Sequence, residues 1–375
     1  MIRLIAAGAA IFLVYLLEQL LYRRLWSRGL GVRIQFKQDS LFEGEEGVLL
    51  ETVENQSRLP LPVIQVKFQT SRSLIFASGK GSRSTDQYYR NDVFQIGGGE
   101  RVTRSLVFSA GKRGFYRINS CDLVASDLFL TAHMMKTLPV QTSVLVYPNP
   151  WDSQEFRLSL QQINGEMLAR RHLLEDPFEY RGIRDYQPSD DMRSINWKAT
   201  AKTGELKVNQ KNCTSLKAVR IFLNLEDNGI LKKEECVEAC LRVAAGLCEY
   251  FLGQGMQVSC CGNSRDCITG EPLSLEAGAG AGQMTAVYKS LARTDAGDVL
   301  PFVPLWQNRL SDCAEGSFTF LVTPCHYDAF TELIRQFDRA GNDFVWFYPV
   351  CGTTDPKLPS DIEKHIRFLH IQGNA

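Results

Sequence analysis

The sequence has no net charge, no metal-binding cysteine motif and no phosphate-binding loop. Its 42 Lys and Arg balance 42 Asp and Glu, so no overall field attracts nucleic acid or acidic ligands. None of the 11 cysteines forms a Cys-x2-Cys pair and the five histidines are scattered, which argues against a zinc site. No Gly-x4-Gly-Lys-Ser/Thr segment is present, so nucleotide hydrolysis by this chain is not expected.

The cysteines also lack the spacing of a disulfide framework. Ten of them follow residue 212, and pairs such as Cys236/Cys240 and Cys260/Cys261 are typical of small buried side chains. We therefore expect free thiols in a reducing compartment.

Long apolar runs are confined to the N-terminus. Leu4 to Leu17 is unbroken, and Leu20 to Tyr22 extend it past Glu18 to about 19 residues, close to the roughly 20 that span a bilayer. A secretory signal peptide is the competing interpretation, but no small-x-small cleavage site follows. We predict that residues 1–29 form an uncleaved single-pass anchor that contacts the membrane through residues 4–22.

Positive charges predict the orientation of this anchor. Arg23, Arg24 and Arg28 follow the span, and only Arg3 and the terminal amine precede it. The positive-inside rule then places the C-terminal domains in the cytoplasm.

Residues 30–150 indicate β-structure. Alternating runs such as 32–36, 48–53, 63–68, 92–96, 102–108 and 144–147 are separated by turn residues at intervals near ten. This spacing predicts a β-sandwich of immunoglobulin type. We expect no acid pair or histidine cluster inside it, and a structural or adhesive role.

From residue 216 to 375 strands alternate with helices. Strand patterns cover 219–225, 256–261, 318–322, 343–348 and 366–371, and helical spacing covers 234–252, 283–291 and 327–340. This alternation predicts an α/β domain with a parallel sheet covered on both faces.

Residues 151–215 form a linker with a short helical pattern at 154–163 and a highly charged segment at 178–202. Arg181, Arg184 and Arg193 can each form a forked pair with a neighbouring carboxylate. Two interpretations stay open: a docking surface for another protein, or an internal brace between domains. We favour the brace, because Ile195 and Trp197 need somewhere to be buried.

This segment resembles the signature of domain of unknown function family 58. The matching residues are Arg184, Asp185, Tyr186, Pro188, Asp190, Arg193, Ile195, Trp197, Lys198, Thr200, Ala201 and Lys202, followed by the segment 204–208, with further likeness at 111–116 and 126–129. Ser189 stands where the family has Gly, the residue that a turn with positive φ favours.

The resemblance implies that residues 216–375 form a von Willebrand factor A-like, Rossmann-like domain without an enzymatic activity of its own or a cofactor. It also implies a MoxR-type AAA+ ATPase as partner, in the assembly of envelope or membrane complexes. We expect the binding residues to be those of the signature, namely Arg184, Asp185, Tyr186, Pro188, Asp190, Arg193, Trp197 and Lys198.

Two alternatives place chemistry at the ends of the strands. Domains of the von Willebrand factor A type hold a metal after their first strand, where this chain has Asn224, Glu226, Asp227 and Asn228. Because Asn replaces the leading Asp, we expect a degenerate site without metal, although the carboxylates offer oxygen ligands. A thiol enzyme built on Cys325 with His326 and Asp328 is the second alternative; neighbours at a helix start rarely converge on one substrate.

Overall fold

The computed structural model describes residues 1–76, 82–84, 87–173, 175–187, 192, 195–213, 218–226, 234–310, 317–352, 356 and 358–371. The chain divides into two compact units. Unit 1 comprises Met1–Asn149 with Leu291–Arg293, and unit 2 comprises Pro150–Ser290 and Thr294–Ala375. The segment 151–215, which the sequence suggests as a linker, thus belongs to the second unit.

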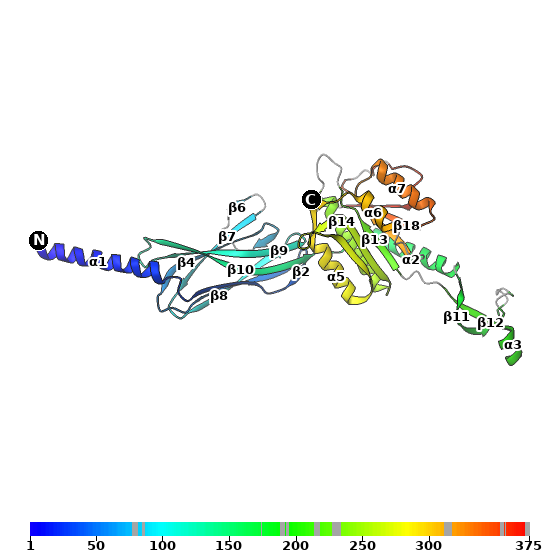
Figure 1. The fold of residues 1–375 in the computed structure, drawn as a ribbon, viewed down its shortest axis with the longest axis horizontal. Helices are drawn as coiled ribbons and strands as arrows, with labels where there is room; N and C mark the ends of the chain where they lie inside the picture. Colours follow the sequence, from blue (N-terminus) through cyan, green and yellow to red (C-terminus); the bar gives the residue numbers. More distant parts are fainter. Residues whose placement is uncertain are drawn as a thin grey trace. The chain divides into compact units, whose positions relative to one another are not determined.

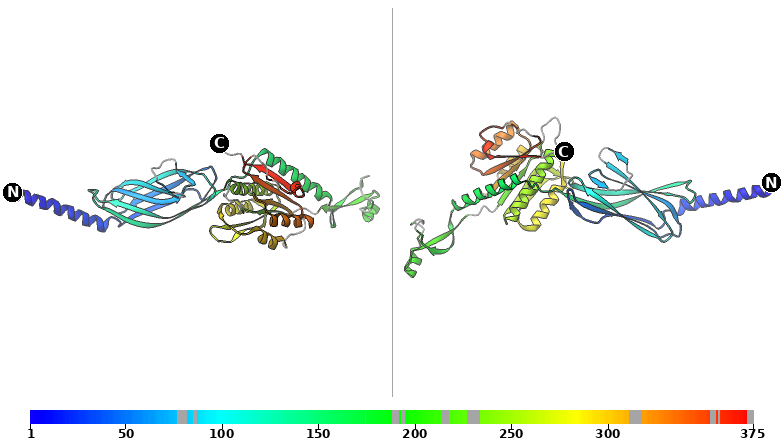
Figure 2. Two further views of the ribbon diagram at one scale, coloured as in Figure 1. Left: turned by 90° about the horizontal axis from the view of Figure 1, so that it is seen from above. Right: turned by 180° about the vertical axis from the view of Figure 1, so that it is seen from behind.

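Unit 1 consists of one long helix and a β-sandwich (Figure 1). Its elements are α1 (Ile2–Leu25), β1 (Leu30–Phe36), β2 (Ser40–Phe42), β3 (Glu46–Asn55), β4 (Leu61–Ser71), β5 (Leu74–Phe76), β6 (Ser82–Ser84), β7 (Gln87–Ile96), β8 (Arg101–Ala110), β9 (Gly114–Ser126) and β10 (His133–Tyr147). One sheet has the order β1-β3-β8-β5 and the other β2-β10-β9-β4-β7-β6. Figure 2 shows the two sheets lying face to face.

Period-two alternation builds the core of the sandwich. On β3, Leu49 and Val53 point inward and are fully buried, while their neighbours are partly exposed. Each such aliphatic side chain contributes about 1.5–3 kcal/mol on burial. The β-sandwich predicted from the sequence is therefore present.

The interior of the sandwich also holds charged groups, and our expectation of no acid pair there is wrong. Glu51 and Asp92 are both buried, with Arg90 beside them. Arg90 and Arg104 each form an ion pair with Asp92. The coulombic influence of Asp92 reaches Glu51 and raises its pKa further than burial alone.

Helix α1 is long and apolar enough to span a membrane, with a mean hydropathy of 2.1 over its most apolar window. The residues of that window are not buried by the rest of the described chain. The C-terminal end of the helix joins the core of the sandwich: Tyr22 and Trp26 lie in that core, and the Tyr22 hydroxyl donates to the carbonyl of Pro60 at 2.9 Å.

Unit 2 is a mixed α/β structure. Its elements are α2 (Gln154–Leu173), β11 (Glu175–Asp185), α3 (Trp197–Thr203), β12 (Lys207–Cys213), β13 (Ala218–Leu223), α4 (Glu234–Gly253), β14 (Gln257–Asp266), β15 (Pro272–Gly278), α5 (Gly280–Arg293), β16 (Thr294–Val299), α6 (Phe302–Leu310), β17 (Ser317–Val322), α7 (Asp328–Arg339), β18 (Phe344–Val350), the 3-10 helix Glu363–His365 and β19 (Ile366–His370). Strands β11 and β12 form a separate two-stranded sheet.

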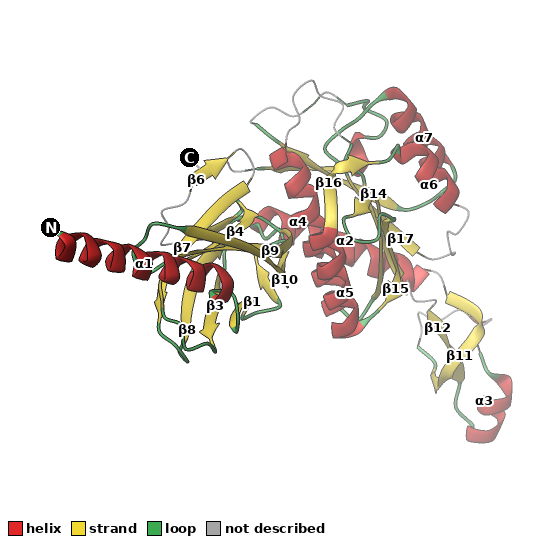
Figure 3. Cartoon of the chain, turned by 60° about the vertical axis from the view of Figure 1, so that its left-hand side comes forward, coloured by secondary structure: helices red, strands yellow, loops and turns green. Residues whose placement is uncertain are grey.

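The main sheet of unit 2 has the order β15-β14-β13-β17-β18-β19, with β16 also pairing with β14. The strands from β14 to β19 along this order run parallel, whereas β15 and β16 are antiparallel to β14. Helices cover both faces, as the sequence predicts (Figure 3). On one face Trp346 contacts Phe330 of α7 at 5.3 Å between ring centroids, and on the other Phe320 contacts Phe251 of α4 at 4.9 Å.

The expectation that all cysteines are free is wrong. Cys236, at the start of α4, and Cys351, after β18, form a disulfide with their Cα atoms 6.0 Å apart. Cys240, Cys248 and Cys260 are buried free thiols, as predicted. Because disulfides persist in oxidising compartments, this pair removes the support that cysteine usage gave to a cytoplasmic location.

Candidate functional site

The carboxyl edge of the main sheet is the first place to look for a site. The order of strands reverses between β13 and β17, which lie side by side in parallel. In open α/β sheets ligands bind at this switch point, beyond the carboxyl ends of the strands. Asn224 follows β13 there, Thr323 follows β17, and Asn263 lies on β14.

Two buried amides close this edge. Asn263 donates through Nδ2 to Oδ1 of Asn224 at 2.8 Å and to the carbonyl of Leu300 at 2.9 Å. Its own Oδ1 accepts from the backbone N–H of Leu225 at 2.9 Å. Both side chains belong to fully buried residues. A carboxylate at position 224 would bury a negative charge here, whereas the amide of Asn224 forms its hydrogen bonds with neutral partners.

Glu226 uses both of its carboxyl oxygens inside the fold. Oε1 accepts from the backbone N–H of Phe302 at 2.9 Å, at the start of α6, and Oε2 accepts from the Tyr327 hydroxyl at 2.8 Å. Burial, and then the hydrogen bond to Glu226, raise the pKa of Tyr327, which therefore stays a donor. Asp227 and Asn228 lie outside the described residues.

The geometry gives this edge a structural role. Within the described ranges, no group of three or more His, Cys, Asp and Glu side chains is arranged to hold a metal ion. Asn224 and Glu226, the two described positions of the degenerate metal motif, connect strand ends to α6 and α7 instead.

The thiol of Cys325 lies beneath the same edge. It is buried, 3.7 Å from Nδ2 of Asn224 and 3.5 Å from the hydroxyl of Thr323. Nδ1 of His326 lies 3.2 Å from the Tyr348 hydroxyl, which gives that ring nitrogen a partner outside any thiol pair. Cys325 is thus placed as a packed side chain rather than as a nucleophile facing solvent.

The charged signature forms a small substructure, which we call the signature hairpin: β11, α3 and β12. The strands pair in antiparallel register with Asp185 opposite Lys207 and Arg184 opposite Val208. Ile195 forms an isolated bridge to Val208, and both side chains are buried. They are the small core of the hairpin.

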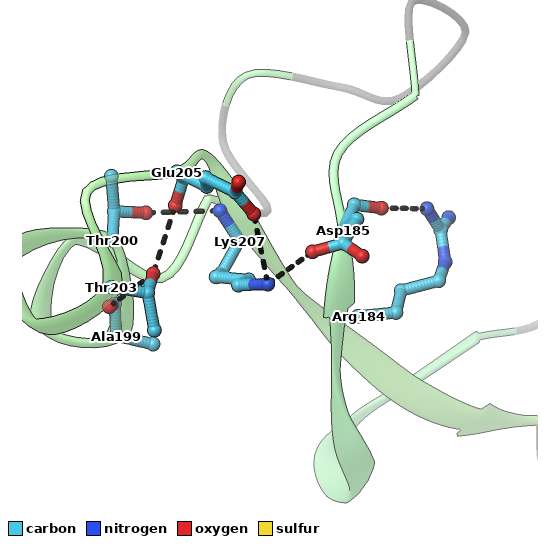
Figure 4. A network of polar contacts seen from close by, with 7 residues as sticks. All are labelled: Arg184, Asp185, Ala199, Thr200, Thr203, Glu205 and Lys207. Atoms are coloured by element: carbon cyan, nitrogen blue, oxygen red, sulfur yellow. Dashed lines mark hydrogen bonds and ion pairs between the residues drawn. The ribbon is translucent and has the colours of Figure 1, made fainter.

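Polar side chains fix helix α3 on the hairpin (Figure 4). Asn196 caps its N-terminus by accepting from the backbone N–H of Ala199 at 2.9 Å, a contact worth about 1 kcal/mol. Thr200 accepts from the backbone N–H of Lys207 at 3.0 Å. Gly204 ends the helix with a φ of 74°, the left-handed conformation that favours glycine.

Lys207 connects the two ends of this structure. Its ammonium group forms an ion pair with Asp185 and lies 3.6 Å from Glu205. The hydrogen bond that the Lys207 ammonium donates to the Asp185 carboxylate raises the pKa of Lys207. Because the carboxylate side chains are 74% and 77% exposed, these pairs set geometry more than stability.

The arginine of the signature makes a local contact. Arg184 donates to the backbone carbonyl of its neighbour Asp185 at 3.0 Å (Figure 4). Tyr186 donates its backbone N–H to the carbonyl of Leu206 at 2.9 Å. Lys198 is exposed on α3. Pro188, Asp190 and Arg193 lie outside the described residues.

Large apolar side chains of the signature hairpin are exposed. Trp197, at the start of α3, is 64% exposed, against the expectation that it is buried in a brace; Ile195 is buried as expected. Ile183, Met192 and Leu206 are also exposed. Sequence reasoning missed the exposure of Ile183 and Leu206, although Ile183 lies near the end of β11 and Leu206 directly precedes β12.

Comparisons with known proteins add little to this site. No family model matches the chain, and no curated protein matches it. Solved structures to which it is similar include the CARDB domain of the PF1109 protein from Pyrococcus furiosus, at 15% identity and a TM-score of 0.22, covering 32% of this chain and 90% of that one. A non-cellulosomal cohesin from Archaeoglobus fulgidus matches at 12% identity and a TM-score of 0.20, covering 31% and 90%. Likenesses at this level carry no functional argument.

Proposed function

We propose that this chain is a membrane-anchored adaptor protein of domain of unknown function family 58, which docks a partner protein through its signature hairpin. The observation that carries the proposal is Trp197: a large aromatic side chain, 64% exposed, on a hairpin in which Ile195 and Val208 are buried. Tryptophan is the residue type most enriched among side chains that dominate protein–protein binding.

The remainder of the hairpin supports a docking role. Ile183 and Leu206 are exposed apolar neighbours of the charged motif, and Lys198 and Asp185 provide charge of both signs. An apolar anchor among polar side chains is the usual anatomy of an interface. The closed carboxyl edge of the sheet favours no enzymatic alternative, because Glu226 and Cys325 are both engaged within the fold.

The family resemblance gives the partner its identity in this proposal, a MoxR-type AAA+ ATPase. It also gives unit 2 its fold type, a von Willebrand factor A-like domain. The strand order supports that fold type. Numbered along the chain, the strands lie in the order three, two, one, five, six, seven, and the fourth, β16, pairs with β14 outside this row. The reversal beside the first strand is that of a doubly wound sheet. The third strand, β15, is antiparallel at the edge.

Helix α1 supplies the anchor. Its 24 residues have a length of about 36 Å at 1.5 Å per residue, more than the roughly 30 Å of a hydrocarbon core. Arg23 and Arg24 lie in its last turn, and this positive charge favours an orientation with the C-terminal units in the cytoplasm.

Site-specific photocrosslinking tests the docking role. A photoreactive amino acid at position 197 of the full chain, in native membranes, should crosslink to the MoxR-type ATPase. The same amino acid at Ile268, which is 49% exposed in the turn after β14, is the matched control and should not. Equal crosslinking at both positions, or none to the ATPase at position 197, would refute the proposal.

A further inference from the structure

The turn between β9 and β10, residues 127–132, presents three consecutive apolar side chains to its surroundings. Leu128, Phe129 and Leu130 are 54%, 53% and 54% exposed. Single exposed apolar residues are common on soluble domains, but adjacent large ones at a loop tip mark a surface that contacts something apolar.

The turn is held in this shape by a buried carboxylate. Asp127 accepts from the backbone N–H and the hydroxyl of Thr131, both at 2.6 Å, and from the backbone N–H of Ala132 at 3.1 Å. Leu130 has a φ of 60°, a left-handed conformation that a branched side chain rarely adopts. Such a conformation persists only where its surroundings impose it. The contacts of the turn therefore fix the conformation of the exposed tip.

The same turn lies against helix α1. The backbone N–H of Leu128 donates to Oε1 of Glu18 at 2.9 Å, and the Tyr15 hydroxyl donates to Oγ1 of Thr131 at 3.2 Å. The Phe129 ring lies 6.0 Å from the ring of Tyr15. These contacts join elements more than one hundred residues apart in the chain.

The position of the contact along α1 gives the depth of the turn. Tyr22, whose side chain is buried in the sandwich core and whose hydroxyl donates to the carbonyl of Pro60, marks where α1 enters the domain. Tyr15 precedes it by seven residues, about 10 Å along the helix axis. Interfacial protein segments bury their apolar side about 5–10 Å into the boundary between headgroups and acyl chains.

We propose that the 127–132 turn enters the interfacial layer of the bilayer beside α1, with Leu128, Phe129 and Leu130 against the acyl chains. The inference rests on the anchoring of α1 in the membrane. The occupant is lipid because the tip is continuous with the exposed apolar surface of the helix, at a depth where lipid surrounds that helix. The turn is a second point of attachment, and it fixes the tilt of the sandwich relative to the membrane.

Tryptophan quenching in vesicles tests this contact. The full chain is reconstituted in vesicles of phosphatidylcholine and phosphatidylglycerol with brominated acyl chains, which quench tryptophan only on contact. Three variants are compared with the parent chain: Phe129→Trp in the turn, Phe12→Trp in the exposed part of α1, and Ile75→Trp. Ile75 is 58% exposed on β5 and lies beside Gly111, at the opposite end of β9 from the turn.

Relative to the parent chain, the fluorescence of the additional tryptophan should be quenched in Phe129→Trp and Phe12→Trp. In Ile75→Trp it should be unquenched and red-shifted. Quenching at position 12 without quenching at position 129 would overturn the turn contact and leave the anchor intact. A blue-shifted but unquenched signal at position 129 would show that a second protein copy covers the tip, which also overturns it. An unquenched signal at position 12 would refute the anchor, and the turn contact with it.

Discussion

Glu51 offers the sharpest test of how the sandwich is stabilised. It points into the core from β3 and is fully buried, and neither carboxyl oxygen accepts a hydrogen bond from the described residues. Burial and then the charge of Asp92 raise its pKa, the charges of Arg104 and Arg90 oppose them, and the net result is a rise from an ordinary value of 4.5 to about 8. At neutral pH the folded protein therefore holds this carboxyl in its protonated form.

The sign of the pH dependence follows from the raised pKa. The unfolded chain releases the proton above about pH 4.5 and the folded chain only above about pH 8, so folding takes up a proton between these values. The free energy of unfolding then falls as pH rises through this window. The full shift corresponds to about 5 kcal/mol, and the part between about pH 6 and pH 9 to about 3 kcal/mol, a large share of a typical domain stability of 5–15 kcal/mol.

The substitution Glu51→Gln removes this titration while keeping the size of the side chain. The full chain in detergent is unfolded with urea at about pH 6 and about pH 9, and pulsed hydrogen exchange on the β3 peptide follows unit 1 separately from unit 2. We expect the parent chain to lose about 3 kcal/mol more than the variant between the two pH values. Glu54→Gln on the same strand is the control, because hydrogen bonds from Gln56 and Arg101 lower the pKa of Glu54 below this window.

An equal loss of stability in the parent and in Glu51→Gln would refute this reasoning. It would mean that Glu51 is ionised in the folded core throughout, with Arg90 and Arg104 neutralising it. The Cys121 thiol, whose pKa burial raises to about 11, titrates too high to produce the same signal.

Three further predictions concern unit 2 and the anchor. Ile195→Ala should destabilise the signature hairpin by about 2–5 kcal/mol, whereas Trp197→Ala should leave its stability within about 0.5 kcal/mol of the parent. Hydrogen exchange across β12 measures both losses, and equal losses would contradict the exposed position of Trp197. Glu226→Ala should lower the melting temperature of unit 2 with or without Mg²⁺; a melting point that Mg²⁺ raises in the parent but not in this variant would restore the metal hypothesis. A reporter fused after Ala375 should be active only in the cytoplasm, and activity on the other side of the membrane would reverse the proposed orientation and agree with the disulfide.

The strands of the sandwich that have clean alternation could be predicted from the sequence. β3 and β8 show period two along their length, and the sequence places both within a few residues. β9 was missed, although it lies between β10 and β4 within the larger sheet. Its burial pattern loses phase at Asn119 and Ser120, opposite an irregularity in β10 between Pro139 and Thr142. A search for period-two alternation fails where a β-bulge gives one strand an extra residue relative to its partner strand.

In unit 2 the buried strands and amphipathic helices could be predicted, and α6 could not. Pro304 lies within α6, so the segment looks unsuited to a helix. It is tolerated because it falls in the first turn, where its missing N–H has no helical partner. Phe302 and Trp306 are then fully buried, and the Glu226 carboxylate caps the start of the helix.

The candidate site could be located from the sequence, but which of its side chains are buried could not be predicted. The motif at 184–202 is visible in the residues, yet whether Trp197 is buried depends on the folded hairpin, in which Ile195 and Val208 are buried and Trp197 is exposed. Composition cannot show which of these apolar side chains faces inward. The brace hypothesis assumed that an aromatic residue beside a charged cluster must pack inward, and in this hairpin the turn of α3 directs it outward.

Glu18 and the 127–132 turn illustrate why the membrane end of unit 1 escapes sequence reasoning. A carboxylate near the end of a span is costly in hydrocarbon, and an apolar loop tip is costly in water. Each looks unfavourable in isolation. In the folded unit the Leu128 N–H gives Oε1 of Glu18 a donor, and in the membrane position proposed above the apolar side chains of the tip leave water beside α1. The contact between residues 18 and 128 reduces the first cost and holds the tip beside α1, and no local pattern in the sequence contains that contact.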